Sequence, residues 1–390
     1  MIYVHIPFCR SFCTYCDFYS EVAAKCRRAE DEAGQEEMFR QFGIALAEEV
    51  AGRANEITDE VNTLYIGGGT PSVLPLSVFG ALMKALRASG NGGPYDEFTV
   101  EVNPEDIVEK GTAYVEGLLE LGVNRISMGV QSFDDGILKF MNRRHDAASA
   151  RKAYSILEEA GAENISIDLI FGLPQLSDSR WKDTLQQALE ISSRGTLPQH
   201  ISSYQLSVEP GSMLARMVDK GLWKEAPDEL CERQYYMLCE VMSKAGYNHY
   251  EISNFALPGR EALHNSAYWS HVPYVGLGPG AHSFCTGGEC GNAASFIRRW
   301  NRGDLKAYLA DPFSVQEYET LDEEQLSLEK IMLALRTSSG IPVGYLREHC
   351  DLKALDKAVA AGDLIMNTDG NLRIPESRFF ISDSIISDIV

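Results

Sequence analysis

Three cysteines near the start of the chain constrain its fold more than any other feature. Cys9, Cys13 and Cys16 have the spacing C-x-x-x-C-x-x-C and follow directly after a short β-branched run that predicts a strand. Thiolates hold iron–sulfur clusters, and such clusters usually take four of them. Three thiolates in one loop would leave one iron of a four-iron cluster open to a substrate. The spacing therefore predicts an iron–sulfur site of a catalytic kind.

Two alternatives stay open for these thiols. They are a zinc site that lacks its fourth ligand, and structural cysteines that share a loop by chance. A zinc knuckle usually repeats its C-x-x-C pair or adds a nearby histidine. The next cysteine, Cys26, lies instead in a charged stretch with a helical pattern. This context favours the cluster.

The first two-thirds of the chain alternates short apolar runs with amphipathic stretches, which is typical of βα units and a parallel sheet. Six such units are fewer than the eight of a closed barrel, so we predict an α/β fold with an open, partial barrel. Strands are expected at Ile2–Ile6, Thr63–Ile66, Phe98–Val102, Arg125–Val130, Asn164–Phe171 and His200–Leu206. Helices are expected at Glu36–Gly52, Leu76–Ala88, Asp106–Leu121, Ala147–Ala160, Ser179–Ser192 and Asp228–Ala245.

Chemically distinctive residues stand at the carboxyl ends of these strands. The carboxyl ends of parallel barrel strands converge on one rim, so residues far apart in sequence should meet there. Glycines let a ligand approach the backbone closely. A lone buried carboxylate is costly, so Glu101 in its apolar strand needs a ligand or, alternatively, a structural ion pair. Besides the cysteines, the expected rim residues are Gly68, Gly69, Thr70, Glu101, Gln131 and Asp168.

Beyond residue 245 the pattern changes, and we predict three segments. Residues 1–245 form the partial barrel, and residues 246–295 extend it with one more strand at 247–255 and the segment His264-Asn265-x-x-Tyr268. Residues 296–390 are expected to form a helical, winged-helix-like domain. Its predicted parts are helices at Glu323–Arg336 and Val343–His349 and a hairpin of Asp363–Met366 with Asn371–Ile374, joined by an Asp-Gly turn.

Composition excludes several classes of partner. The formal net charge is −21, with 56 acidic against 35 basic residues. An acidic surface disfavours nucleic acid and anionic membranes. The basic group Arg298, Arg299 and Arg302 is therefore interpreted as a solvated helix face.

Cysteine use and hydropathy predict a cytoplasmic protein. No run of about 18 apolar residues predicts a membrane-spanning helix, and no signal peptide precedes the first strand. Scattered cysteines suit a reducing compartment, so Cys285 and Cys290 are expected to be free thiols.

The stretch from Tyr3 to Phe18 resembles the signature of the radical S-adenosylmethionine (SAM) superfamily, and its letters Tyr-Val-His-Ile-Pro-Phe-Cys are similar to the HemN/HemW group. The resemblance implies the superfamily's (β/α)6 barrel and a [4Fe–4S] cluster on Cys9, Cys13 and Cys16. It also implies an electron donor for the cluster and cleavage of SAM to a 5′-deoxyadenosyl radical. The positions that match SAM contacts are Tyr3, Tyr15, Gly68, Gly69, Thr70, Glu101, Gln131, Arg143 and Asp168.

Some of these positions have open alternatives. Tyr3 and Tyr15 are equally consistent with core packing. Arg143 and Arg144 are adjacent, and only the match to the motif favours Arg143 as the inward residue.

Two branches of this group differ from each other at positions that can be compared with this sequence. The oxygen-independent coproporphyrinogen III dehydrogenases carry a fourth cysteine two positions after the third, whereas this chain has Phe18. They also have a long segment before the first strand, where this sequence has two residues before Tyr3. Cys-Asp-Phe and His264-Asn265-x-x-Tyr268 are instead similar to the HemW-type haem chaperones, and the similarity covers nearly the whole chain.

The resemblance to the chaperones implies reversible haem binding and transfer of haem to respiratory enzymes, with no dehydrogenase activity. His and Tyr are both known axial ligands of haem iron, so His264 and Tyr268 are candidate haem-binding residues. A hydrogen-bonded loop that supports the barrel is the alternative for this segment. A dehydrogenase, or a radical SAM enzyme with another substrate, is the alternative function.

Overall fold

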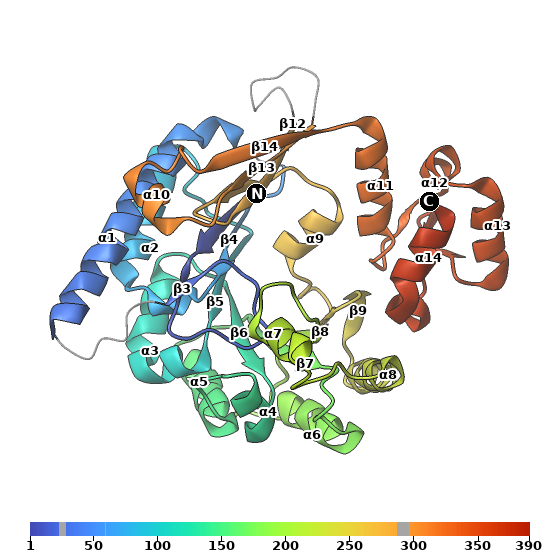
Figure 1. The fold of residues 1–390 in the computed structure, drawn as a ribbon, viewed down its shortest axis with the longest axis horizontal. Coiled ribbons are helices and arrows are strands. Elements are labelled where there is room, and N and C mark those ends of the chain that lie inside the picture. The colour runs from blue at the N-terminus through green and yellow to red at the C-terminus, as the bar shows by residue number, and fades with distance from the viewer. Residues whose placement is uncertain (23–28, 59, 287–295) are drawn as a thin grey trace.

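The computed structural model describes residues 1–22, 29–58, 60–286 and 296–390, and a nine-stranded sheet lies at its centre (Figure 1). Six neighbouring parallel strands form the middle of this sheet. They are β1 (Ile2–Ile6), β4 (Thr63–Gly68), β5 (Glu97–Val102), β6 (Arg125–Gln131), β7 (Ile165–Phe171) and β8 (His200–Gln205). Each predicted strand ends within two residues of its observed bounds, so the partial barrel is confirmed.

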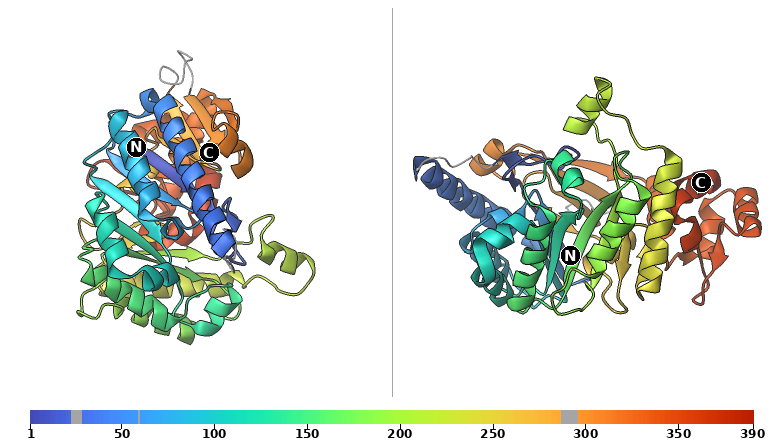
Figure 2. Two further views of the ribbon diagram at one scale, coloured as in Figure 1. Left: turned by 90° about the vertical axis from the view of Figure 1, so that its left-hand side faces the viewer. Right: turned by 90° about the horizontal axis from the view of Figure 1, so that it is seen from below.

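Helices cover the outer face of the sheet, between successive strands. Those that follow the six parallel strands are α1 (Ala29–Gly52), α2 (Leu76–Ala88), α3 (Pro104–Glu120), α5 (Ala147–Glu159), α6 (Asp178–Leu189) and α8 (Asp228–Lys244). Two short helices that the sequence pattern did not predict are α4 (Asp135–Phe140) and α7 (Met213–Asp219). The segment that carries α7 projects away from the body of the barrel (Figure 2).

Side chains alternate between the two faces of each parallel strand. In β6, Ile126, Met128 and Val130 belong to the hydrophobic core under the helices. Arg125 and Ser127, on the other face, line a cavity. Burial of each large apolar side chain contributes about 1.5–3 kcal/mol relative to exposure, which fixes the orientation of the strand. The polar face is thereby turned into the barrel.

Three further strands extend the sheet at its edges. The predicted strand at 247–255 is two strands, β9 (Asn248–Glu251) and β10 (Asn254–Ala256), which pair antiparallel with each other next to β8. On the opposite edge, β11 (Val275–Leu277) pairs parallel with β1. The sheet order begins with β11 and ends with β9, so the barrel stays open.

The expectation of helix from residue 296 onward is wrong. The strands β12 (His282–Thr286), β13 (Phe296–Asn301) and β14 (Gln316–Leu321) form an antiparallel sheet, with the short helix α10 (Leu305–Ala310) between the last two. The predicted boundary at 295/296 therefore falls inside this sheet. Aromatic and β-branched residues favour a strand at 296–301, and its pairing with β14 overrides the helical pattern.

The basic group on β13 is also not a solvated helix face. Arg298 Nη1 lies 3.1 Å from Glu319 Oε1 on the neighbouring strand, and Arg299 Nη1 lies 2.6 Å from Glu56 Oε1. The cross-strand pair Arg298–Glu319 favours the observed register, whereas the pair Arg299–Glu56 joins β13 to the turn after α1. Arg298 and Arg299 are therefore paired with carboxylates and do not form a free basic patch.

A group of helices with a small β wing completes the chain, as predicted (Figure 1). Its helices are α11 (Glu323–Ala334), α12 (Val343–His349), α13 (Leu352–Ala361) and α14 (Ser382–Ile389). Its wing consists of β15 (Ile341–Pro342), β16 (Ile365–Met366) and β17 (Asn371–Arg373).

The structure bears on two expectations, the one about membrane-spanning helices and the one about free cysteines. None of the helices in the described ranges is long and apolar enough to cross a membrane. Cys285 is disulfide-bonded, so its expectation as a free thiol is wrong. Cys26 and Cys290 lie outside the described residues.

A buried ion pair fastens α1 to the sheets. Glu49 and Arg53 are both buried, and Arg53 Nη1 donates to Glu49 Oε1 at 3.1 Å. The other oxygen of Glu49 accepts from the Tyr308 hydroxyl and from Gly278 N, each at 2.8 Å. The carboxylate thus joins α1, α10 and the residue that follows β11.

We predict that Glu49→Ala destabilises the protein by about 1–3 kcal/mol, because it leaves the buried Tyr308 hydroxyl and the Gly278 amide without their acceptor, while Arg53 keeps Glu56 as an ion-pair partner. Urea unfolding followed by circular dichroism measures the change. The matched control is Glu37→Ala, which removes an exposed partner of Arg40 on the same helix and should leave the free energy of unfolding unchanged. Equal effects of the two variants would contradict the assignment.

Candidate functional site

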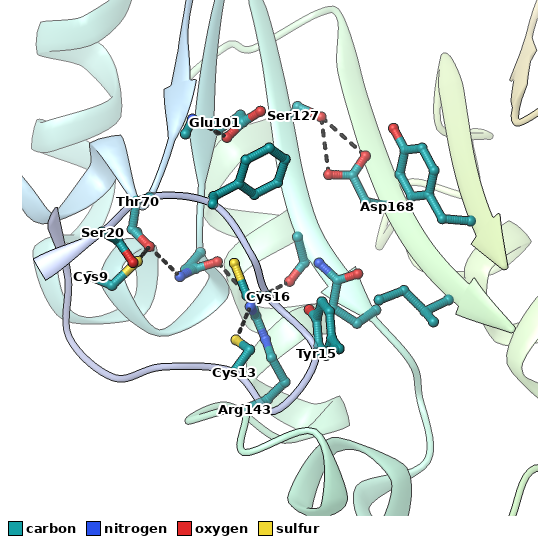
Figure 3. A pocket seen from close by; sticks show the side chains of 18 of the residues that line it. Cys9, Cys13, Tyr15, Cys16, Ser20, Thr70, Glu101, Ser127, Arg143 and Asp168 are labelled. Carbon is teal, nitrogen blue, oxygen red and sulfur yellow. Dashed lines mark hydrogen bonds between the residues drawn. The ribbon is translucent and has the colours of Figure 1, made fainter. Parts of the chain in front are cut away.

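A cavity of about 480 Å³ opens at the carboxyl ends of the parallel strands (Figure 3). Cys9, Cys13 and Cys16 lie on the loop at one side of it, and Glu101 and Asp168 lie on the strands opposite (Figure 3). The predicted site residues that line this cavity are Cys9, Cys13, Tyr15, Cys16, Gly68, Gly69, Thr70, Glu101, Gln131, Arg143 and Asp168. Convergence of the strand ends thus brings together residues that are up to about 160 positions apart.

The cysteine loop is held by hydrogen bonds from two other parts of the chain, residues 141–142 and the helix α7. At the centre of the loop, Thr14 N donates to Met141 O at 3.1 Å, and Thr14 O accepts from Leu214 N at 2.8 Å. The amide of Asn142 donates to Phe12 O at 2.7 Å. The shape of the loop therefore depends on contacts beyond its own sequence.

The three thiols share one wall of the cavity with a cation. Arg143 Nη1 lies 3.5 Å from Cys13 Sγ, and the Thr70 hydroxyl lies 3.3 Å from Cys9 Sγ. Burial raises the pKa of the Cys9 thiol and raises that of Cys16 to about 12. Metal coordination would be needed to hold both as thiolates at neutral pH.

The donor set fits an iron–sulfur cluster by its chemistry. Within the described ranges, no three His, Cys, Asp or Glu side chains are already drawn together as metal ligands. The loop nevertheless presents three soft thiol ligands to one cavity, and such ligands select iron–sulfur clusters or zinc over hard cations.

The glycines after β4 allow a close approach to the cysteine loop. Gly69 N donates to Ile6 O at 2.8 Å, and a Cβ at Gly69 would lie 2.7 Å from Phe8 O. Gly68 has a φ of +101°, a conformation that favours glycine. These glycines therefore position the loop in addition to lining the cavity.

Glu101 has hydrogen-bond partners in place of the ion pair considered above. Tyr65 Oη donates to Glu101 Oε1 at 2.7 Å, and Gly68 N donates to Oε2 at 3.2 Å. No cation within the described residues lies within 4.0 Å of this carboxylate. Burial raises the pKa of Glu101 to about 7 despite these donors.

Arg143 is the inward residue of its pair, whereas Arg144 is exposed at the rim. Arg143 Nη2 donates to Asn103 Oδ1 and to Gly129 O, each at 2.7 Å. These bonds aim the guanidinium at the cysteine loop. The motif-based preference for Arg143 agrees with this geometry.

Gln131 and Asp168 lie on neighbouring strands. A register irregularity after Gly129 leaves Gln131 with a φ of +67°, which is rare for a residue other than glycine. Such backbone strain clusters at functional sites. The Ser127 hydroxyl lies 3.2 Å from Asp168 Oδ1, and burial raises the pKa of Asp168.

Three predicted residues do not line the cavity. Tyr3 lies behind it, with its hydroxyl 3.1 Å from His5 Nδ1. His264, on the helix α9 (Leu263–Trp269), is buried, with Nδ1 2.9 Å from Thr63 Oγ1 and Nε2 3.3 Å from the hydroxyl of Tyr268. Burial lowers the pKa of His264 to about 3, so its ring is neutral. Within this segment, Asn265 is the residue that lines the cavity.

Sequence reasoning missed polar residues deeper in the barrel. The cavity is also lined by Tyr65, Arg125, Ser127, Ser202 and Tyr204. Each lies at an even spacing from another inward residue of its strand, as Ser127 lies two positions after Arg125. The period-two pattern of the strands carries this signal.

Comparisons with known proteins agree with this geometry. The family model of the Radical SAM superfamily matches residues 3–188. "Heme chaperone HemW" of Lactococcus lactis is 34% identical over 343 residues, which cover 87% of this chain and 82% of that protein. The protein of the same name from Escherichia coli is 31% identical, with 93% of this chain and 91% of that protein covered.

The fold has a counterpart among solved structures. Coproporphyrinogen III oxidase (HemN) from Escherichia coli matches with a TM-score of 0.78 at 21% identity, over 99% of this chain and 89% of that chain. This likeness concerns the fold. The HemW relatives over most of its length show that the chain belongs to the HemW family, and its residues 3–188 match the radical SAM superfamily.

Proposed function

We propose that this protein is a haem chaperone that holds a [4Fe–4S] cluster and SAM in its cavity and binds haem for delivery to haem-requiring enzymes. The observation that carries the proposal is the similarity to proteins named heme chaperones over 87% of the chain, together with three cysteines on one cavity. An electron donor for the cluster and respiratory enzymes that receive haem are the proposed partners. The proposed location is the cytoplasm.

The residues of the cavity fit a cluster and SAM. Cys9, Cys13 and Cys16 would hold the cluster, which when bound with SAM supplies one-electron chemistry. Arg143 would offset negative charge on the thiolates, since it lies beside Cys13. The glycine turn leaves room for a ligand. The predicted SAM contacts that line the cavity are Tyr15, Gly68, Gly69, Thr70, Glu101, Gln131, Arg143 and Asp168, whereas Tyr3, also predicted, does not line it.

The rim of the cavity suits a flat, apolar ligand. Phe12 and Phe18 line it and are 51% and 62% exposed. Exposed aromatic side chains of this kind offer an apolar face to a macrocycle. We keep His264 and Tyr268 as proposed axial ligands, and their bonds to Thr63 and to each other mean that ligation requires α9 to move.

The runner-up function is that of a coproporphyrinogen III dehydrogenase, which the likeness to the HemN fold favours. Phe18 occupies the position of the fourth cysteine in that branch, and this substitution argues for the chaperone. A radical SAM enzyme with another substrate is the third possibility.

We predict one four-iron cluster per chain after anaerobic reconstitution with iron and sulfide. Cys13→Ser should abolish the visible absorption and the iron content, because a serine hydroxyl is a poor ligand for iron of this kind. Cys239→Ser is the matched control, since this half-buried thiol lies outside the cavity. A full cluster in the triple Cys9, Cys13 and Cys16 serine variant would refute the site.

We predict that Glu101→Gln weakens SAM binding about tenfold or more and leaves the iron content unchanged, because hydrogen bonds to a charged group contribute about 1.5–3 kcal/mol. Isothermal titration calorimetry measures the affinity. Exposed Glu120 on α3 provides the control Glu120→Gln.

The raised pKa of Glu101 adds a pH dependence to this prediction. With a pKa of about 7, the carboxylate is ionised above pH 7 and becomes protonated as the pH falls below it. The affinity of the wild type for SAM should therefore fall between pH 8 and pH 6, whereas that of Glu101→Gln stays flat. Parallel pH profiles in the two proteins would return Glu101 to a purely structural role.

We predict a Soret band when haem is added, and no conversion of coproporphyrinogen III to protoporphyrinogen IX. His264→Ala or Tyr268→Ala should shift or weaken the band, since each removes a proposed ligand. The exposed His349 on α12 supplies the control His349→Ala. Efficient conversion of coproporphyrinogen III by the purified protein would instead establish the dehydrogenase.

A further inference from the structure

Arg125 is a buried cation in the deep part of the cavity, and it is not among the proposed cluster, SAM or haem contacts. It is 2% exposed and lines the cavity from the first position of β6. No carboxylate of the described residues lies within 4.0 Å of its guanidinium. Among the described residues its Nε has no hydrogen-bond partner, and its Nη1 makes one long contact of 3.5 Å with the Thr99 hydroxyl.

An unpaired guanidinium at this depth is costly. Arginine has five N–H donors and cannot lose its proton in a protein. Removing such a charge from water without a partner costs several kcal/mol. The side chain therefore points to an anion that is absent from the protein itself.

The neighbouring carboxylates are already engaged by other donors. Arg125 acts on Asp168 and Glu101 through space and favours their ionised forms. Glu101 accepts from Tyr65, and Asp168 accepts from Ser127. The nearby Glu97 accepts from backbone amides of α9, and Thr99 stands between it and Arg125. The forked donor set of Arg125 stays open to the cavity.

We propose that Arg125 forms a carboxylate-binding subsite in the deep part of the cavity, with Asn265 as a second donor. Guanidinium groups bind carboxylates in a bidentate manner, with geometric specificity as well as charge. Asn265 lies on α9 and lines the same cavity, and its side-chain amide has no hydrogen bond to the described residues.

Two ligands of the proposed function carry the required group, and the inference rests on that function for their identity. One is a haem propionate, and the other is the carboxylate of a SAM molecule. Each has a close analogue without the charge, namely haem dimethyl ester and decarboxylated SAM. The two pairs therefore separate the two sources.

The experiment measures the affinity of reconstituted protein for both members of each pair, with Soret titration for haem and calorimetry for SAM. In the wild type, the member of one pair that carries the carboxylate should bind more tightly than the member that lacks it. Arg125→Gln should reduce that preference about tenfold or more. Arg87→Gln removes one exposed charge on α2 and should leave the preferences unchanged.

Each outcome has a definite meaning. Loss of preference in the haem pair assigns the subsite to a propionate, and loss in the SAM pair assigns it to SAM. Unchanged preferences in both pairs would overturn the inference and make Arg125 a counterion of the barrel. Failure of the wild type to bind haem would contradict the chaperone proposal, while the SAM pair would still decide the subsite.

A folding control keeps the test decisive. Circular dichroism verifies that Arg125→Gln is folded. If it is not, Arg125→Met takes its place, because methionine fills a similar space and carries no charge. A reduced preference in Arg125→Met would support the subsite, and an unchanged one would refute it.

Discussion

The two-residue alternation along the parallel strands is the constraint on which the rest of the structure depends. Ile126, Met128 and Val130 on one face of β6 pack under the helices and fix the orientation of the strand. The same orientation turns Arg125 and Ser127 inward, away from that core. A slip of one residue would exchange the two faces. Stability and site chemistry therefore come from one pattern.

The inward faces gather charges that the protein compensates only in part. Tyr65 and Ser127 donate to the carboxylates Glu101 and Asp168, and Asn103 accepts from Arg143. Electrostatic interactions are stronger in such an interior than in water, so each unmatched donor or acceptor has a large effect. The raised pKa of Glu101 reflects that burial. A cavity with both signs of charge suits a ligand that also carries both.

The His264 ring lies against the inner wall of the barrel rather than in the cavity. Backbone amides at the start of α9 donate to Glu97, and the His264 ring lies 5.1 Å from that of Tyr65. Tyr65 in turn donates to Glu101. Tyr65 therefore connects α9 to Glu101, the residue proposed to contact SAM. A shift of α9 would reach that carboxylate through the Tyr65 side chain.

The sequence by itself determined the barrel and the outline of its rim. Period-two strands, amphipathic helices and the spacing of Cys9, Cys13 and Cys16 are local patterns, and they need no knowledge of distant contacts. The carboxyl-end rule then brought Glu101, Gln131 and Asp168 to one place. It did so because parallel strands have one common direction.

Only the tertiary structure decided which side chains reach the cavity. His264 and Asn265 are neighbours in sequence, yet the hydrogen bond to Thr63 buries the first while the second lines the cavity. The strand at 296–301 forms because it pairs with β12 and β14, although its local pattern suggested a helix. Arg125 has no ion pair among the described residues, and Thr99 links it to Glu97 through hydrogen bonds. Each outcome depends on contacts between distant segments, which a local pattern does not contain.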